Sequence, residues 1–354
     1  MPILRFISIV IILSLILFAY PVWRLGDWLQ FPPLLHLLST LLLFSSQFIV
    51  RIGLRNRTGR LIYLLRGSGD FFLGLSPVLL GLVLLGEAIL LITDIPELTV
   101  GLMVCGTTVL AATWGVWAAW RPRVVTVPLT SHKLTRPARF VQISDVHIGS
   151  RTERFLRQTL QQVEALNPDF LCITGDFIDQ PDITVDKLKS LAEFKRPIYF
   201  STGNHERYED HDQIMERLTS LGVTVLRNEA VMVDGLQIIG IDDGDDPEQV
   251  AKVLPSIEVR NDCYSILLYH RPQGIEAAEA QGVDLKISGH THNGQIFPFS
   301  YAVKTRFEYL KGLHPYKSAY LYVNEGTGTW GPTLRIGTRS EVTLFELSPE
   351  TIRV

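Results

Sequence analysis

Five short segments of the sequence carry carboxylate, amide or imidazole side chains, which are groups that bind divalent metal ions. They are DVH (residues 145–147), GDFID (175–179), GNHE (203–206), YHRP (269–272) and GHTH (289–292). Carboxylates and imidazoles without thiolates suit Mn²⁺, Fe or Zn²⁺. In an extended DxH segment the first and third side chains point to the same face, so Asp145 and His147 can hold one ion together, and GHTH repeats this geometry. The segments therefore predict a metal site.

Each segment alone also has an ordinary structural explanation. An Asp after a strand is often the cap of a turn or helix, and a single His is often a core or surface residue. Chance is a poor explanation for the whole set, because packing these groups together without a metal would leave buried polar side chains unpaired. We interpret the histidines that lack such partners as structural or surface residues: they are His36, His132, His211 and His314.

The elements that must position these segments are short strands that alternate with helices over residues 130–354. VQIS, FLCIT, IYFST, SILLY and LKIS are apolar runs, and each precedes a polar loop that contains Gly or His. Apolar side chains recur at helical spacing over residues 152–167. Such alternation predicts an α/β sheet, and ligands of α/β sheets gather at the carboxyl ends of the strands.

The first 120 residues differ in character and contain four apolar stretches, at residues 3–22, 31–50, 71–93 and 98–120. Each is long enough to cross a bilayer, which takes about 20 largely uncharged residues. Glu87 is the only acidic residue inside them, and it could face neighbouring helices. The first stretch has the apolar character of a signal peptide, but no small-residue cleavage site follows it, so we expect a retained anchor.

The charges of the connections predict an orientation. The connection after the third stretch has only the acids Asp94 and Glu97, whereas the one after the second is basic. Its basic residues are Arg51, Arg55, Arg57, Arg60 and Arg66. Basic connections usually lie in the cytosol. Because the number of spans is even, the region after Arg121 should lie on the same side, which places the C-terminal domain in the cytosol.

The overall charge and the cysteines argue against a stable nucleic-acid partner, a disulfide framework and a thiolate zinc site. The formal net charge of −3 over 354 residues gives no reason to expect a stable nucleic-acid partner. The three cysteines are far apart and lack CxxC spacing, so neither a disulfide framework nor a thiolate zinc site is indicated.

In their order, the five segments resemble the motifs of the calcineurin-like metallophosphoesterase superfamily over about residues 138–348. NEGTGTWGPTLRIGTRSE (324–341) resembles its bacterial membrane-associated phosphodiesterase-like and transmembrane subgroup. The resemblance implies a four-layer α/β/β/α double β-sandwich after an all-α region of four transmembrane helices, in a bacterial inner or plasma membrane. We divide the chain into an anchor (1–122), a linker (123–137) and a catalytic domain (138–350).

The resemblance also implies a role for individual residues around two divalent metal ions, with Mn²⁺ expected and Fe or Zn²⁺ as alternatives. The implied metal ligands are Asp145, His147 and His292 for one ion, Asp176 as a bridge, and Asn204, His270 and His290 for the other. His205 would be the catalytic acid, oriented by Asp179. The alternative for Asp179 is a cap of the helix expected over TVDKLKSL.

The implied activity is hydrolysis of a phosphodiester or pyrophosphate bond in a phosphorylated small molecule or lipid. Relatives in the superfamily hydrolyse UDP-2,3-diacylglucosamine. Residues 297–322 mix basic with aromatic side chains, which suits an anionic membrane surface, although a solvated loop with core aromatics has the same composition. The alternatives are a nuclease or protein phosphatase, and a non-catalytic membrane scaffold with a retained metal site.

Overall fold

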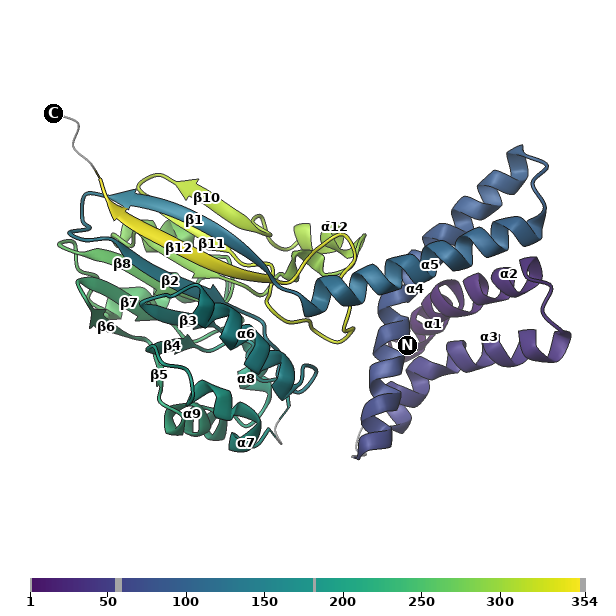
Figure 1. The fold of residues 1–354 in the computed structure, drawn as a ribbon, viewed down its shortest axis with the longest axis horizontal. Coiled ribbons are helices and arrows are strands. Elements are labelled where there is room, and N and C mark those ends of the chain that lie inside the picture. The colour runs from purple at the N-terminus through teal and green to yellow at the C-terminus, as the bar shows by residue number, and fades with distance from the viewer. Residues whose placement is uncertain (1, 55–58, 181–182, 351–354) are drawn as a thin grey trace. The chain divides into compact units, whose positions relative to one another are not determined.

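The computed structural model describes residues 2–54, 59–180 and 183–350, and the chain forms two compact units (Figure 1). Unit 1 comprises Met1–Trp117 with Ile296–Pro298 and Gly331–Ile336. Unit 2 comprises Ala118–Gln295, Phe299–Trp330 and Gly337–Val354.

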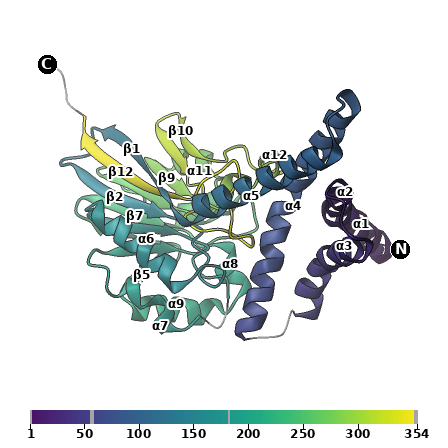
Figure 2. The same cartoon turned by 45° about the vertical axis from the view of Figure 1, so that its right-hand side comes forward.

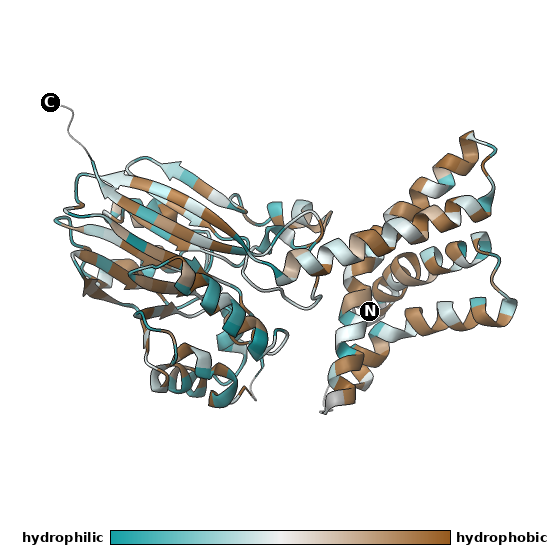
Figure 3. Ribbon diagram, viewed as in Figure 1, coloured by the Kyte–Doolittle hydropathy of each residue, from teal (hydrophilic) through white to brown (hydrophobic). Residues whose placement is uncertain are grey.

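Long apolar helices make up most of unit 1. They are α1 (Pro2–Ser14), α2 (Tyr20–Trp28), α3 (Pro33–Phe48), α4 (Arg60–Ile92) and α5 (Glu97–Trp120), with π-helical turns at Leu15–Ala19 and Ile49–Gly53. Within the described residues, four stretches are long and apolar enough to cross a membrane, Ile7–Trp28, Pro33–Gly53, Leu61–Ile92 and Glu97–Trp120. Hydrophobic residues run along these helices in Figure 3. The four apolar helices expected from the sequence are confirmed, and the third begins ten residues earlier than expected because α4 continues through Asp70.

A fully buried Trp28 packs unit 1 together. It lies in one apolar cluster with Val83, Val100 and others. A Cβ on Gly86 would lie 2.8 Å from the indole of Trp28, so this approach of α4 to α2 requires glycine. Near this cluster, the Arg24 side chain donates a hydrogen bond to Glu87 on α4. Glu87 thus faces a neighbouring helix and has a charged partner there, as expected for an acid inside an apolar stretch.

Two short segments from the C-terminal half belong to unit 1. Arg335 N donates a hydrogen bond to the Gly115 carbonyl of α5 at 2.9 Å. A Cβ on Gly74 of α4 would lie 2.7 Å from Pro332. Glycines at these two helix positions therefore allow the segments to lie against the helix backbones.

The described residues of unit 2 form two mixed six-stranded sheets. The first has the order β1 (Arg123–Ser131), β12 (Glu341–Pro349), β2 (Ala138–Ile143), β3 (Phe170–Thr174), β4 (Ile198–Ser201), β5 (Val223–Val225). The second has the order β10 (Gly312–Tyr316), β11 (Ala319–Val323), β9 (Leu285–Ser288), β8 (Tyr264–Leu268), β7 (Leu236–Gly240), β6 (Glu229–Val233). The pairs β2–β3, β3–β4, β7–β8 and β8–β9 are parallel.

Helices cover the outer faces of both sheets, as Figures 1 and 2 show. The described helices of unit 2 are α6 (Glu153–Ala165), α7 (Val185–Leu188), α8 (Asn204–Tyr208), α9 (His211–Ser220), α10 (Gln249–Val253), α11 (Ile275–Ala280) and α12 (Phe299–Lys304), and α12 buries none of its residues. Strand residues alternate between two cores, since Phe140 of β2 packs between the sheets whereas Val141 packs against α6 and α9. A third core joins the second sheet to α10 and α11. The four-layer α/β/β/α sandwich is therefore confirmed.

The linker expected over residues 123–137 is largely a strand. β1 pairs in parallel with β12 along its whole length, from Arg123 opposite Glu341 to Ser131 opposite Pro349. Val127 and Leu129 of β1 are buried in the core between the sheets. The sandwich therefore begins at Arg123 and not at residue 138. The pairing partner lies 218 residues further along the chain, so no local pattern could reveal it.

Candidate metal centre and active site

The five segments follow the carboxyl ends of β2, β3, β4, β8 and β9. In parallel strands these ends lie at one edge, which is where α/β sheets gather their ligands. DVH, GDFID and GNHE come from the first sheet, and YHRP and GHTH come from the second. The side chains that the sequence singled out therefore approach one region from both sheets.

The backbone turns sharply at these segments. Asp145, His147, Asp176, His290 and His292 have φ values of 54°, 56°, 49°, 71° and 47°, in the left-handed region that non-glycine residues rarely adopt. Such a conformation costs on the order of 1–3 kcal/mol for a residue and clusters at functional sites. The surrounding sandwich holds all five residues in this strained geometry.

Among the described residues, three groups of side chains lie close enough to hold a metal ion. They are Asp145, His147 and His292; His147, Asp176 and His205; and Asp176, His270 and His290, and within each group the donor atoms lie within 4.8 Å of one another. His147 and Asp176 each belong to two groups, so the groups form one continuous cluster. The seven residues expected as ligands include the members of the first and third groups, and Asn204 lies directly before His205 in α8.

Short distances connect donor atoms across the two sheets. In the first group, His292 Nε2 lies 3.3 Å from Asp145 Oδ1 and 3.2 Å from His147 Nε2. In the third group, His270 Nε2 lies 3.2 Å from Asp176 Oδ2 and 3.1 Å from His290 Nδ1. The first group therefore joins Asp145 and His147 of the first sheet to His292 of the second, and the third group joins Asp176 of the first sheet to His270 and His290 of the second.

The orientation of these donors fits divalent cations. His270 Nδ1 lies 2.8 Å from the Thr174 carbonyl, which can only accept, so Nδ1 carries a proton and Nε2 is the nitrogen left to bind a metal. Asn204 Oδ1 is buried and has no hydrogen-bond partner in the described part of the chain. A buried amide oxygen without a partner is costly, and a cation at that position would satisfy it.

Charge and burial act against each other in the cluster. Burial disfavours ionisation of Asp176, but the imidazoles of His270, His147 and His205 together outweigh it and hold the pKa of this carboxyl well below its ordinary value. Burial also opposes the charge on His270, and Asp176 nevertheless raises the pKa of His270 to about 10. Burial lowers the pKa of His290 to about 3, helped by the neighbouring His270. A cation at this site would therefore have to displace the proton shared by His270 and Asp176.

Comparison with known proteins shows to which family the chain belongs. Residues 138–294 match the model of the calcineurin-like phosphoesterase family. An uncharacterised metallophosphoesterase of Aquifex aeolicus is 32% identical over 225 residues, which cover 59% of this chain and 84% of that protein. The chain belongs to the calcineurin-like phosphoesterase family. Members of this family depend on two metal ions, in agreement with the candidate ligands described above.

Other relatives of this family member cover more of the chain. An uncharacterised metallophosphoesterase of Helicobacter pylori is 32% identical over 243 residues, covering 65% of this chain and 65% of that protein. A transmembrane protein with metallophosphoesterase domain from Danio rerio is 34% identical over 273 residues, covering 67% of this chain and 60% of that protein. The match thus spans slightly less than two thirds of these relatives. Together with the four apolar helices, the second relative indicates a membrane protein.

Asp179 of this family member has other partners than the sequence analysis expected. Both of its carboxylate oxygens accept from Ser150, from N at 3.0 Å and from Oγ at 2.5 Å, and Oδ2 lies 3.7 Å from His147 Nδ1. In the described residues no hydrogen bond or ion pair joins it to His205, and the helix over TVDKLKSL has Thr184, not Asp179, at its N-cap position. A Cβ on Gly149 would lie 2.2 Å from Asp179, so the loop of Ser150 closes tightly over this carboxylate. Asp179 therefore adjoins an expected metal ligand and not the expected acid.

The expected acid, His205, lies in the same cluster. Its backbone N donates to Asp176 Oδ1 at 2.9 Å, and its half-buried ring lies 4.7 Å from the ring of His147. Burial lowers the pKa of His205, and Asp176 partly opposes this shift.

Glu206 has a positioning role that the sequence analysis did not assign. Its fully buried carboxylate accepts from the backbone N–H groups of Asp176 at 3.0 Å, Phe177 at 2.7 Å, Ile178 at 3.0 Å and Gly203 at 2.8 Å. Burial, together with the negative Asp176, raises its pKa to about 7. One side chain thus joins GDFID to GNHE. The sequence offered one indication of this role, namely that Glu206 is the last residue of GNHE. Its hydrogen-bond partners depend on the tertiary fold.

A charged network joins two of the same loops. Arg271, next to His270, donates to Asp243 through Nε at 2.7 Å and Nη2 at 3.1 Å. Arg207 of α8 contacts the same carboxylate at 3.0 Å. The Asp243 side chain is fully buried. Asp243 therefore holds the segments that carry His270 and His205 against the loop after β7. The acidic composition of that loop alone did not reveal this link.

Proposed function

We propose that this chain is a membrane-anchored phosphoesterase that hydrolyses phosphodiester or pyrophosphate bonds with two divalent metal ions. Asp145, His147 and His292 hold one ion in this proposal, Asp176 bridges, and Asn204, His270 and His290 hold the other. The observation that carries the proposal is the continuous cluster of donors, with the buried oxygen of Asn204 left without a partner among the described residues. Membership of the calcineurin-like phosphoesterase family supports it.

When bound, the metal pair supplies an activated water and neutralises charge on the phosphoryl oxygens. His205 then protonates the leaving oxygen in our proposal, because its ring lies beside the cluster and is only partly buried. Burial lowers the pKa of this imidazole, but an anionic phosphoryl group would favour its charged form. Asp176 fixes the backbone of His205 and so helps to aim the ring.

The proposal extends to the place of action and the substrate. We place the catalytic domain, residues 138–350 with β1 added, in the cytosol and the helices of residues 1–122 in a bacterial inner membrane, as the basic connection near Arg51 indicates. A lipid-linked substrate such as UDP-2,3-diacylglucosamine is our candidate. Its support is α12, where Phe299 and Tyr301 have 46% and 67% exposed side chains next to Lys304. Exposed aromatic and basic residues together suit an anionic membrane surface.

The test uses the purified full-length chain, loaded separately with Mn²⁺, Fe²⁺ and Zn²⁺. Hydrolysis of bis(p-nitrophenyl) phosphate, p-nitrophenyl phosphate and UDP-2,3-diacylglucosamine is measured together with metal content. We expect diester or pyrophosphate hydrolysis with about two bound ions per chain, and loss of both ions and activity in Asp176→Asn. A chain that binds metal but cleaves none of these substrates would be the scaffold alternative and would overturn the proposal.

A further inference from the structure

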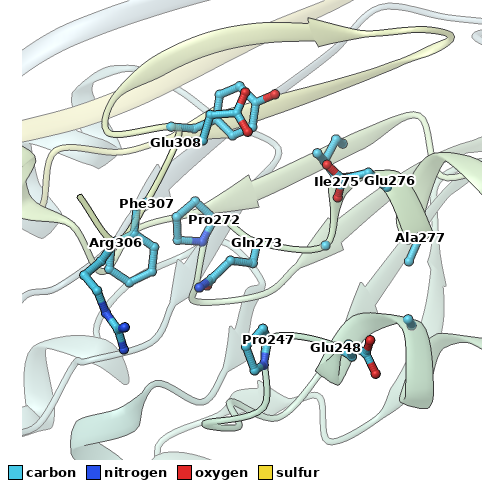
Figure 4. A pocket seen from close by; sticks show the side chains of 13 residues that line it. Pro247, Glu248, Pro272, Gln273, Ile275, Glu276, Ala277, Arg306, Phe307 and Glu308 are labelled. Carbon is cyan, nitrogen blue, oxygen red and sulfur yellow. The ribbon is translucent and has the colours of Figure 1, made fainter. Parts of the chain in front are cut away.

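A pocket with a volume of about 390 Å³ lies in unit 2 (Figure 4). Its walls come from the segment that starts α10, from the loop 272–277 that leads into α11, and from residues 306–309 after α12. The volume is in the range typical of sites for small molecules.

Covalent and packing contacts connect this pocket to the metal centre. Pro272 in its wall follows His270 by two residues. The ring of Phe307 packs edge-on against the ring of His290, with centroids 5.1 Å apart. Thr291, between two expected ligands, donates a hydrogen bond of 2.6 Å to the Leu310 carbonyl and so fixes the 306–309 wall to GHTH. A group attached to a phosphate at the metal centre therefore has this pocket beside it.

The backbone of the pocket is fixed before any ligand binds. Gly274 has a φ of +86°, and a Cβ there would lie 2.8 Å from Val250, so only glycine allows this turn to pack on α10. Pro272 is buried. A preformed wall orders little on binding and therefore costs little conformational entropy.

The pocket presents both hydrogen-bond donors and acceptors. The amide of Gln273 and the guanidinium of Arg306 line it, and neither side chain has a partner in residues 2–54, 59–180 and 183–350. The carboxylates of Glu248, Glu276 and Glu308 line it as well. Figure 4 shows Arg306 and Gln273 near the ring of Phe307, whereas Glu248 and Glu276 lie toward the helices. The 306–309 wall thus carries the donor Arg306 and the acceptor Glu308, and the amide of Gln273 can both donate and accept.

A polyhydroxylated ring matches this arrangement. Each hydroxyl both donates and accepts, so it can pair with a carboxylate and with an amide or guanidinium. Carboxylates recognise sugar hydroxyls in this way elsewhere, as at the ribose of dinucleotides. The rings of Phe307 and Tyr309 add flat apolar surface against which a ring can lie. A purely apolar substituent would instead leave the polar side chains desolvated and unpaired.

We propose that this pocket binds a sugar-like polyhydroxylated ring esterified to the reacting phosphate, with Gln273 and Glu276 as residues that determine specificity. The proposal rests on the proposed function, since it assumes that the phosphate is cleaved at the neighbouring metal centre.

The experiment compares two diesters that differ only in the ring hydroxyls, p-nitrophenyl glucosyl phosphate and p-nitrophenyl cyclohexyl phosphate. The full-length, metal-loaded chain should prefer the glucosyl ester in kcat/KM. We expect Gln273→Ala and Glu276→Ala each to reduce the ratio of the two kcat/KM values about 5-fold, mainly through KM, as for one lost hydrogen bond. Gln281→Ala, which changes an exposed residue at the end of α11 outside the pocket, is the matched control and should leave the ratio unchanged.

A binding measurement provides a readout that does not depend on turnover. Calorimetric titration of the metal-free chain should give tighter binding of glucose 1-phosphate than of cyclohexyl phosphate, and Gln273→Ala should remove the difference. Equal treatment of both esters by the wild type, or an unchanged ratio in both pocket variants, would overturn the pocket assignment while leaving the phosphoesterase function intact. Hydrolysis of neither ester by a chain that does cleave bis(p-nitrophenyl) phosphate would also overturn the pocket assignment, whereas a chain that cleaves none of these compounds, nor UDP-2,3-diacylglucosamine, would overturn the proposed function itself.

Discussion

Behind two histidines of the cluster lie groups on the side away from it, a carbonyl at hydrogen-bond distance for His270 and a carboxylate at 3.7 Å for His147. The Thr174 carbonyl fixes the proton of His270 on Nδ1 and leaves Nε2 to face Asp176. On the opposite side of the cluster, Asp179 lies next to His147 Nδ1 while His147 Nε2 faces His292. Groups behind metal-binding histidines commonly set the ring orientation and the ligand strength. The residue types could be predicted from the motifs, but these outer partners depend on how the loops close.

Asp179→Asn tests the position found for this carboxylate. Because Asp179 adjoins His147, we expect the variant to lower metal affinity by about 10- to 100-fold. Titration of the metal-free protein with Mn²⁺ gives the affinity, and Asp186→Asn, an exposed acid seven residues further on, is the control. Unchanged affinity with slower turnover would instead assign Asp179 to the step carried out by His205.

His205→Ala tests the acid. Since the ring lies beside the cluster and its backbone N–H is retained in the variant, we expect metal content to stay at the wild-type level. Turnover of a diester should fall by about 10²- to 10⁴-fold, the usual contribution of a positioned acid. Elemental analysis and kcat are measured on the same preparation. Wild-type turnover in the variant would rule out the assigned role.

Glu206→Gln tests the link between GDFID and GNHE. The amide NH₂ cannot accept, so some of the backbone N–H groups that Glu206 now binds would be left buried without a partner. We expect the free energy of unfolding to fall by about 2 kcal/mol or more. Thermal unfolding of the full-length chain measures the change. Glu216→Gln, an exposed position on α9, should unfold at the wild-type temperature.

The elements of unit 2 show how far a local sequence pattern reaches. Apolar runs such as VQIS and FLCIT correctly located β2 and β3, and the polar loops after them correctly located the edge with the candidate ligands. β1 was assigned to a linker because its single neighbour, β12, is the last strand of the chain. Two segments, Ile296–Pro298 and Gly331–Ile336, were likewise assigned to the catalytic domain by their sequence position alone, whereas they belong to unit 1. Local periodicity predicts which residues form a strand, whereas pairing over such distances requires the tertiary structure.

A pair of substitutions in β1 tests whether this strand is part of the sandwich. Val127 is 5% exposed in the core between the sheets, whereas Val124 is 39% exposed. Val127→Asp would bury an unpaired charge and should destabilise the chain by about 3–5 kcal/mol. Val124→Asp should have little effect. Both are compared by thermal unfolding, and equal stability of the two variants would show that residues 123–131 act as a linker after all.

At the scale of the whole molecule, we expect the basic connections to set the direction of the chain through the membrane. Arg51 forms an ion pair with Asp70 at 2.5 Å, so part of the positive charge near the second span is neutralised in the folded chain. The remaining excess of arginine still favours the cytosol. Reporter fusions after Asp94 and after Val127 measure the two sides. We expect an extracytosolic signal from the first and a cytosolic signal from the second, and the reverse pattern would invert the orientation.

The division of the expected ligands between the two sheets has a consequence for biosynthesis. Asp145, His147, Asp176 and Asn204 follow strands of the first sheet, and His270, His290 and His292 follow strands of the second. On the proposed assignment, one ion needs His292 and the other needs His290, so neither can be fully bound until the ribosome has delivered these residues and the two sheets have docked. Metal insertion is then a late maturation step. A chain truncated before GHTH would lack ligands for both ions and could not retain them after its release from the ribosome.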